Sequence, residues 1–262
     1  MFLSARCWLP GLFSLTLPLA GRAQGAPAPD RRVAEGRDLP TLARTSFHFG
    51  PSVGLNGANV RGVETGGPRA TTIKARAGFE AGVAGQWARG GHWALQAAAR
   101  YTRLGYTQRD QVLVANGAPR VAARMDYRFN YLTVPVSVAY TQFANGQGAQ
   151  VYAGLYAAQF LAGRFETTDL APGCPPRRGP VRAAAAQGLF GGGNYVRPWD
   201  AGLQAGLGYR YGPVLLQAGY VHGLRTLAPA VIQGRGSHFT RPPYYNRAVR
   251  LSLTCFAFGP RD

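Results

Sequence analysis

The 262-residue chain has few cysteines and few acidic residues, and Lys74 is its only lysine. Basic residues number 29 against 11 acidic ones, so the formal net charge is +18. Beyond the N-terminus no run of about 20 apolar residues occurs, which excludes a transmembrane helix in the mature chain. The three cysteines, Cys7, Cys174 and Cys255, have no metal-binding spacing, and we expect no disulfide between the last two. The sequence therefore predicts neither a helical membrane protein nor a cysteine-ligated metal site.

Residues 1–24 have the layout of a secretory signal peptide. A positive charge is followed by a short apolar segment, Trp8–Ala20, which is too short to span a membrane. Small residues near its end predict cleavage after Ala23, with cleavage after Gln24 as the neighbouring option. Residues 25–44 are rich in Ala, Pro and Arg and show no periodicity, so we expect a flexible periplasmic lead-in.

Residues 45–262 contain eight segments in which apolar and polar or glycine residues alternate with period two, which predicts eight β-strands. In the clearest segment, Leu203 and Leu207 lie on one face, and Gln204 lies on the other. The predicted strands cover residues 46–56, 76–87, 92–106, 127–143, 150–165, 199–211, 214–225 and 246–258. Aromatic residues near the ends of the apolar faces predict a girdle: Trp87, Trp93, Tyr101, Tyr140, Tyr209 and Tyr220.

Two segments do not follow this pattern simply. Residues 150–165 carry apolar or aromatic side chains on both faces, so the faces of this strand stay unassigned. Pro135 stands in the middle of a predicted strand, although proline has no N–H to donate to a ladder. We therefore expect a bulge or an inward kink at this proline.

The connections between the predicted strands alternate between short turns and long stretches rich in Gly, Pro and Arg. This alternation is typical of outer-membrane barrels, which have short periplasmic turns and long outer loops. Because hydrocarbon cannot hydrogen-bond the backbone, a membrane-spanning sheet must close on itself. The sequence therefore predicts an all-β fold: an eight-stranded antiparallel transmembrane up-and-down β-barrel in the outer membrane, with short periplasmic turns and long extracellular loops.

The polar residues of the alternating pattern should face the interior, which eight strands leave just wide enough for side chains. We expect Glu80 and Asp200 to pair there with arginines, among Arg100, Arg210, Arg225 and Arg250. The complete predicted lumen network comprises Glu80, Gln96, Arg100, Asp200, Gln204, Arg210, Gln217, Arg225 and Arg250.

The excess of arginine is also typical of nucleic-acid-binding proteins. Here, however, the arginines are spread along the chain, and no helix-turn-helix, zinc-finger or RNP-like motif accompanies them. We expect no nucleic-acid partner. Arginines in outer loops instead predict contact with the phosphates of lipopolysaccharide, which guanidinium groups bind in bidentate fashion.

Several of these strand sequences together resemble the small outer-membrane β-barrel proteins of Bacteroidetes, often called PorT-like. The segments that carry the resemblance are Gly78–Val83, Leu95–Tyr101, Asn130–Val136 and Gly202–Tyr209, and Asn130–Pro135 is the most specific of them. The chain departs from the family in ending with Gly259–Asp262 after Phe258, where family members commonly end on an aromatic residue. The resemblance implies an outer-membrane barrel, and the namesake of the family implies a link to type IX secretion.

These observations predict a monomeric, non-catalytic barrel with a structural or interaction role in the cell envelope, without cofactor or metal. Its expected partners are outer-membrane lipid, lipopolysaccharide and envelope or secretion-complex proteins. One alternative is an outer-membrane enzyme that modifies lipid A, for which Ser237, His238 and either Glu166 or Asp169 are the candidate residues. A second alternative is a soluble ligand-binding barrel of the lipocalin type.

Overall fold

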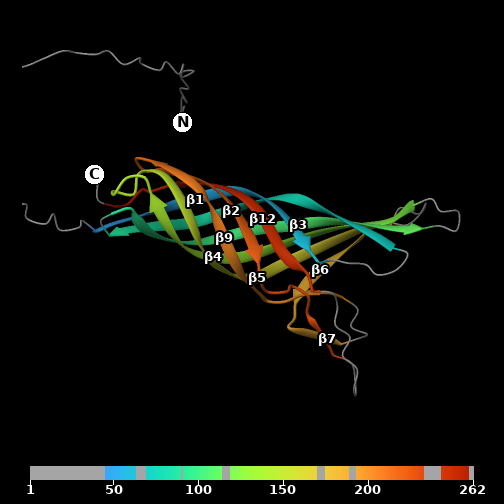
Figure 1. Ribbon diagram of the computed structural model, residues 1–262. Helices are drawn as coiled ribbons and strands as arrows, with labels where there is room; N and C mark the ends of the chain where they lie inside the picture. Colours follow the sequence, from blue (N-terminus) through green and yellow to red (C-terminus); the bar gives the residue numbers. More distant parts are fainter. Residues whose placement is uncertain are drawn as a thin grey trace, which may run out of the picture. The chain divides into compact units, whose positions relative to one another are not determined.

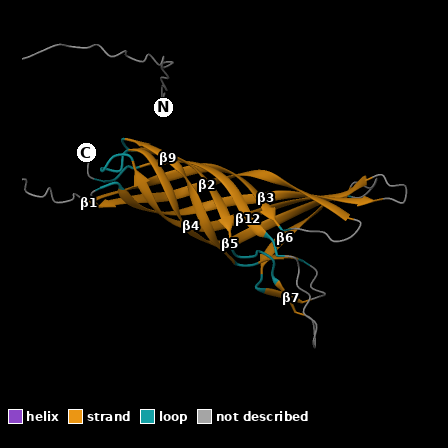
Figure 2. Ribbon diagram, in the orientation of Figure 1, coloured by secondary structure: helices purple, strands orange, loops and turns teal. Residues whose placement is uncertain are grey.

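A computed structural model describes residues 45–62, 69–89, 91–113, 119–169, 175–188, 193–232 and 243–259. The predicted signal peptide and lead-in, residues 1–44, lie outside the described residues, as do Cys174 and the Ser237–His238 pair. Within the described ranges the regular structure is all β (Figure 2). None of the described residues belongs to a helix with the length and apolarity needed to cross a membrane.

Eight long strands form a closed antiparallel ring, which confirms the predicted fold class (Figure 1). They pair in the order β4-β3-β2-β1-β12-β10-β9-β5, and the additional pairing of β4 with β5 closes the ring. Closure gives every ring strand a paired neighbour on each side within the ring, which a membrane-spanning sheet requires. The ring strands are β1 (Thr45–Arg61), β2 (Arg69–Arg89), β3 (Trp93–Leu113), β4 (Pro119–Thr141), β5 (Gly148–Asp169), β9 (Trp199–Tyr211), β10 (Val214–Gly223) and β12 (Tyr245–Cys255).

Short turns join β2 to β3, β4 to β5 and β9 to β10 at one end of the ring, here called the turn end. The turn between β4 and β5 contains the Asn-Gly pair that favours tight hairpins. Gly146 adopts φ = 80°, a left-handed conformation that glycine allows without strain, and the N–H of Gln147 donates to the side chain of Asn145. The opposite end of the ring is called the loop end.

Several ring strands run further toward the loop end than the sequence pattern predicts. Strand β2 begins at Arg69 rather than near residue 76, and β3 continues to Leu113; the two extensions pair with each other beyond a register shift between Ala75 and Glu80. Strand β4 begins at Pro119, so most of the residues predicted as a long loop between β3 and β4 form a hairpin instead. Figure 1 shows these arms projecting beyond the ring. The apolar alternation fades in the arms because neither face is buried in lipid, although the backbone pairing continues.

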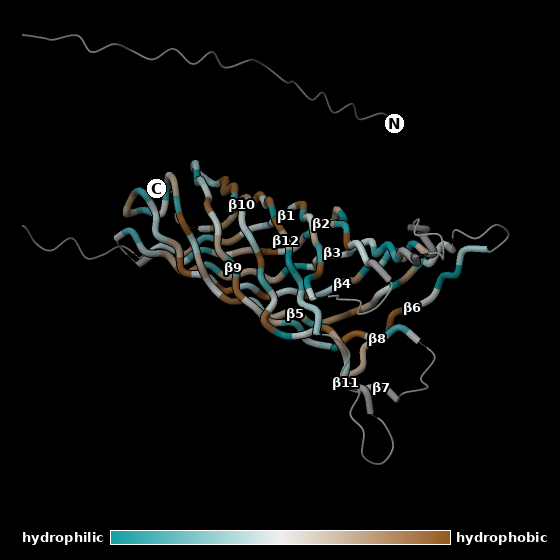
Figure 3. Tube along the Cα trace, turned by 45° about the vertical axis from the view of Figure 1, so that its right-hand side comes forward, coloured by the Kyte–Doolittle hydropathy of each residue, from teal (hydrophilic) through white to brown (hydrophobic). Residues whose placement is uncertain are grey.

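Outward side chains of the ring are apolar, while inward side chains near the turn end are mostly polar. On β4, Val134, Val136 and Val138 are each more than 40% exposed, whereas Thr133 and Ser137 are buried. Figure 3 shows the resulting alternation of hydrophobic and hydrophilic residues along the strands. A continuous apolar band of this extent is typical of a lipid-facing surface and not of a soluble monomer. The six residues of the predicted aromatic girdle are all exposed on it.

Pro135 lies on β4 without a bulge, so the first of the two expected features is absent there. Strand β4 pairs with β3 from Ala97↔Val136 to Arg100↔Thr133 in one constant register, with a gap in the ladder around the proline. Pro135 faces inward and is paired with Tyr156 on the other neighbouring strand. The missing N–H therefore leaves a local gap in the ladder, and the shift that does occur in the β4–β5 pairing lies at Asn130/Tyr131.

Four short strands lie in the long connections at the loop end. Strand β6 (Arg177–Ala183) pairs with the outer part of β5, and β8 (Asn194–Val196) pairs in parallel with β6. Strands β7 (Ala186–Gly188) and β11 (Ala230–Ile232) form a separate parallel pair. The sequence pattern predicts none of them, because segments of three to seven residues are too short to show periodicity.

Candidate functional site

The lumen contains eight of the nine residues predicted for the polar network. Their exposed fractions lie between 2% and 9%. These residues are Glu80, Gln96, Arg100, Asp200, Gln204, Arg210, Gln217 and Arg250. Arg225 is the exception: it is exposed, because β10 ends at Gly223 and the alternation of faces ends with the strand.

A buried charged group occupies the middle of the lumen. The Glu80 carboxylate from β2 accepts a hydrogen bond from Arg100 Nη1 of β3 at 3.0 Å, and Arg250 Nη1 of β12 lies 3.9 Å from its other oxygen. All three side chains are at most 8% exposed. Arg250 also donates to the amide oxygen of Gln204, and Gln204 donates to Ser137 at 2.5 Å. This group therefore links β2, β3, β4, β9 and β12 across the lumen.

Asp200 is placed differently from the prediction, because none of the described arginines forms an ion pair with it. Its Oδ2 accepts from the hydroxyl of Tyr156 at 3.0 Å and from the side-chain amide of Asn246 at 3.3 Å. Neutral donors thus replace the expected arginine partner. No sequence pattern points to these donors, since they come from β5 and β12, 44 and 46 residues away from Asp200.

Amide side chains and one aromatic residue fill the lumen toward the turn end. Gln96 donates to Gln150 and accepts from Gln217, each at 2.9 Å. The guanidinium of Arg210 lies over the ring of Phe256, with its central carbon 4.8 Å from the ring centre. A cation over an aromatic face is electrostatically favourable. This end of the lumen is therefore occupied by side chains from the four ring strands β3, β5, β9 and β10 and from the segment after β12.

Apolar and aromatic side chains fill the lumen toward the loop end, a feature that the sequence analysis missed. Tyr131 is 1% exposed, and its ring contacts Phe160 and Phe129 edge-on, with centroids 5.6 Å and 6.4 Å apart. The surrounding buried cluster includes Val60, Tyr106, Tyr156, Val181, Val196, Val221 and Leu227. We call these residues together with Phe129, Tyr131 and Phe160 the aromatic plug.

The aromatic plug explains why the faces of residues 150–165 stayed unassigned. On β5, Tyr152, Tyr156 and Phe160 point inward, while Val151 and Leu155 point outward. Both faces are apolar because one faces lipid and the other faces the plug. A signal was present on β4, where Tyr127, Phe129 and Tyr131 have the same spacing of two as the inward Thr133 and Ser137.

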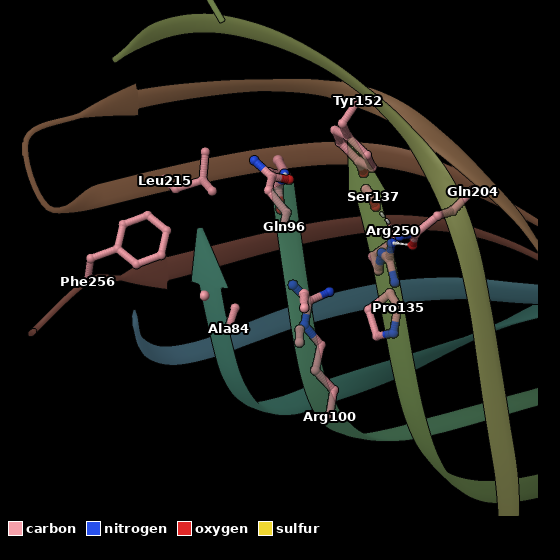
Figure 4. A pocket seen from close by; sticks show the side chains of 14 residues that line it. Ala84, Gln96, Arg100, Pro135, Ser137, Tyr152, Gln204, Leu215, Arg250 and Phe256 are labelled. Atoms are coloured by element: carbon pink, nitrogen blue, oxygen red, sulfur yellow. Dashed lines mark hydrogen bonds between the residues drawn. The ribbon is translucent and has the colours of Figure 1, made fainter. Parts of the chain in front are cut away.

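The remaining space in the lumen is small. Figure 4 shows the cavity around Arg100, Gln96 and Gln204, whose volume is about 30 Å³. A second cavity next to Glu80 and Tyr156 also measures about 30 Å³, and one beside Tyr131 measures about 10 Å³. A single water needs about 10–15 Å³ by this measure. Cavities of this size hold one or a few waters.

Beyond the apolar band, the arms at the loop end carry a cluster of charges around Asp126. The Asp126 carboxylate lies 3.1 Å from both Arg76 Nη1 and Arg124 Nε, and it accepts from the Thr107 hydroxyl. Partial burial favours the neutral acid, but the hydrogen bonds from Thr107 and Arg124 and the charges of Arg124 and Arg76 outweigh it, so the pKa of Asp126 is lowered. The cluster therefore stays ionised at neutral pH and keeps a net positive charge.

The family model of the outer membrane protein beta-barrel domain matches residues 23–228, which is most of the chain. The chain belongs to this family. The protein is accordingly an outer-membrane β-barrel, and the sequence-based resemblance is confirmed at this broader level. By the rule for such barrels, the turn end is periplasmic and the loop end faces outward.

Solved structures of small outer-membrane barrels are similar to this one. The attachment invasion locus protein Ail of Yersinia pestis, solved in complex with the heparin analogue sucrose octasulfate, has 12% identity and a TM-score of 0.39, covering 80% of this chain and 97% of Ail. Neisserial surface protein A has 15% identity and a TM-score of 0.37, covering 79% of this chain and 96% of that protein. OprG from Pseudomonas aeruginosa has 9% identity and a TM-score of 0.32, covering 83% and 96%. The comparison with curated proteins gives no match.

The other candidate residues of the outer-membrane barrel have ordinary surroundings where they are described. Glu166, considered for an enzymatic triad, accepts two hydrogen bonds at Oε1, from Arg178 Nη2 at 2.7 Å and from Arg178 Nε at 2.9 Å. Cys255 is an exposed free thiol on the lipid-facing side of β12. In the described ranges, no three His, Cys, Asp or Glu side chains lie close enough together to hold a metal ion.

Proposed function

We propose that this outer-membrane barrel is non-catalytic and has a structural or interaction role in the cell envelope, acting through its surface and not through a pore. The observation that carries the proposal is the double filling of the lumen. Charged and amide side chains occupy its periplasmic half, and the aromatic plug occupies its outer half. Transport would need an open path through the lumen, and these side chains occupy that space. An interaction function needs only the rigid ring and its projecting arms.

Conductance across a planar bilayer tests the closed lumen. Because both halves of the lumen are packed, the reconstituted full chain should give no stepwise current at 100 mV, whereas a porin inserted in the same bilayer gives large steps. Folded insertion is checked beforehand by the heat-modifiable gel mobility of the sample. Reproducible steps from a correctly folded sample would contradict the proposal, since they would require a continuous aqueous path.

The resemblance to PorT-like barrels supports a narrower version of this role, in which the barrel contacts components of a type IX secretion machine. Affinity capture of the tagged full chain from cross-linked native outer membranes tests it. Secretion components should be enriched over a capture with an unrelated small barrel expressed at the same level. Equal recovery of those components in both captures would rule out the secretion link and leave only the general envelope role.

A further inference from the structure

Two arginines lie directly opposite each other on the outward surface of the loop end. Arg128 of β4 pairs with Arg164 of β5 in the antiparallel register, and both side chains are exposed. Like charges in directly opposed positions destabilise a sheet. The next outward pair in the same ladder, Asp126 and Glu166, is acidic, so compensation of the two arginines depends on whether these acids are engaged by other cations.

The nearby acids do not supply that compensation. Asp126 is engaged by Arg76 and Arg124, and Glu166 is engaged by Arg178. Among the residues that the structure describes, neither Arg128 nor Arg164 forms an ion pair. Both guanidinium groups are therefore available to an external ligand.

Arg128 and Arg164 line a cleft of about 1040 Å³ between β4, β5 and β6. Arg178 and Arg182 of β6 also line the cleft. With Asp126 and Glu166 in the same lining, the four arginines leave the polar part of the cleft with a net positive charge. The lower part of the cleft is apolar. The shift in the β4–β5 register at Asn130/Tyr131 places the successive residues Leu161 and Ala162 both on the outside, where they line the same cleft. The cleft thus joins a cationic upper part to an apolar lower part.

The position of the cleft along the strands matches the boundary between hydrocarbon and headgroups. The outward apolar series on β4 runs from Tyr140 to Leu132, about 26 Å along the strand and about 20 Å across the membrane at a tilt near 40°. Arg128 lies four residues beyond Leu132, which places it roughly 10 Å above the last apolar residue by the same rise and tilt. At this height, on the outer side, lie the phosphates of the outer-leaflet lipid.

We propose that this cleft binds a phosphate of lipid A, the lipid anchor of lipopolysaccharide, with Arg128 and Arg164 holding the phosphate and an acyl chain lying over Leu161 and Ala162. Guanidinium groups suit phosphate because their N–H donors match its oxygens in bidentate geometry. A free anion would use only the arginines, so the adjoining apolar surface favours a lipid. The proposal deepens the interaction role proposed above and rests on it.

Binding of purified lipid A to the folded full chain in detergent tests the site, with affinity measured by thermophoresis. The double variant R128Q/R164Q should lose at least tenfold in affinity. The matched control R61Q/R225Q removes two exposed arginines that do not line the cleft, and its affinity should stay within twofold of the wild type. Equal affinity of the wild type and R128Q/R164Q, or an equal loss in both variants, would overturn the site.

Three further ligands test whether the bound phosphate belongs to lipid A, to another phospholipid or to a free anion. Dephosphorylated lipid A should bind the wild type at least tenfold more weakly than lipid A itself, and inorganic phosphate should not compete at millimolar concentration. Phosphatidylglycerol should show no difference between the wild type and R128Q/R164Q. A tenfold difference with phosphatidylglycerol, or competition by inorganic phosphate, would overturn the assignment to lipid A in favour of a general lipid or a free anion.

Stability without lipid A separates binding from folding. Because R128Q/R164Q removes an opposed like-charge pair, its unfolding temperature in lipid-free detergent should equal or exceed that of the wild type. Lipid A should then raise the unfolding temperature of the wild type but not of the variant. A variant that is less stable than the wild type without lipid A would show that the arginines have a structural role. None of these outcomes bears on the conductance test of the closed lumen.

Discussion

Replacing Glu80 with alanine should destabilise the barrel by about 3–5 kcal/mol, the usual cost of breaking a buried ion pair by removing one partner. The variant leaves the Arg100 and Arg250 side chains, 5% and 8% exposed, without their counter-charge. Their burial has already removed the water that would solvate them. The measurement is the free energy of unfolding in urea with lipid vesicles, followed by tryptophan fluorescence and checked by heat-modifiable gel mobility.

The exposed pair of Glu166 and Arg178 provides the control. Its distance, 2.7 Å, is shorter than that of the buried pair, but the side chains are 34% and 74% exposed. Water and salt screen such a pair, so Glu166→Ala should cost no more than about 1 kcal/mol. If Glu80→Ala also cost no more than about 1 kcal/mol, water in the lumen would screen these charges as effectively as bulk solvent does, and the buried ion pair would not stabilise the barrel.

Truncation of Tyr131 to alanine should also cost about 3–5 kcal/mol, the range measured when a large buried aromatic side chain is removed. Tyr131 is 1% exposed and lies at the centre of the aromatic plug between Phe129 and Phe160. The closed ring limits how far its neighbours can move inward, so most of the vacated volume should remain. The same unfolding measurement applies.

Two control substitutions test whether burial of the Tyr131 ring, and not its hydroxyl or its being a tyrosine, accounts for the loss of stability. Tyr131→Phe should leave the stability unchanged or higher, because the Tyr131 hydroxyl has no hydrogen-bond partner among the described residues. Tyr140→Ala removes a tyrosine that is 45% exposed on the lipid side, stacks on His92 and contacts Trp93 edge-on, so it should cost only about 1 kcal/mol. A loss for Tyr140→Ala as large as for Tyr131→Ala would contradict a plug that stabilises by burial.

The sequence predicted the ring well because lipid imposes a strict pattern on it. Outward Leu203 and Leu207 and inward Gln204 follow from the need to present apolar groups to hydrocarbon, and a period of two reveals them. The arms at the loop end were predicted as loops because this constraint ends with the membrane. Arg69–Ala75 pairs with β3 beyond a register shift between Ala75 and Glu80, although its sequence shows no apolar alternation.

The interior was predicted only in part, because a barrel lumen can be filled either by polar side chains or by apolar and aromatic ones. The pairing of Glu80 with Arg100 could be anticipated, because neighbouring strands bring opposite charges to one face. The partners of Asp200 could not, since Tyr156 and Asn246 reach it from strands far apart in the sequence. The aromatic plug was missed because the expectation of a polar lumen hid the period-two series Tyr127, Phe129 and Tyr131.

The seam between β1 and β12 has a kinetic consequence. Ser52 accepts a hydrogen bond from Thr254, 202 residues later, within a ladder that runs from Ser52↔Thr254 to Arg61↔Tyr245. Contacts between such distant residues raise the contact order and must overcome a large loop-closure entropy before they contribute. Until the last strand docks, β1 and β10 each expose an unpaired backbone edge. Closing the ring by docking β12 should therefore be a slow step of folding. Until then the exposed strand edges must be kept from pairing with other chains and aggregating.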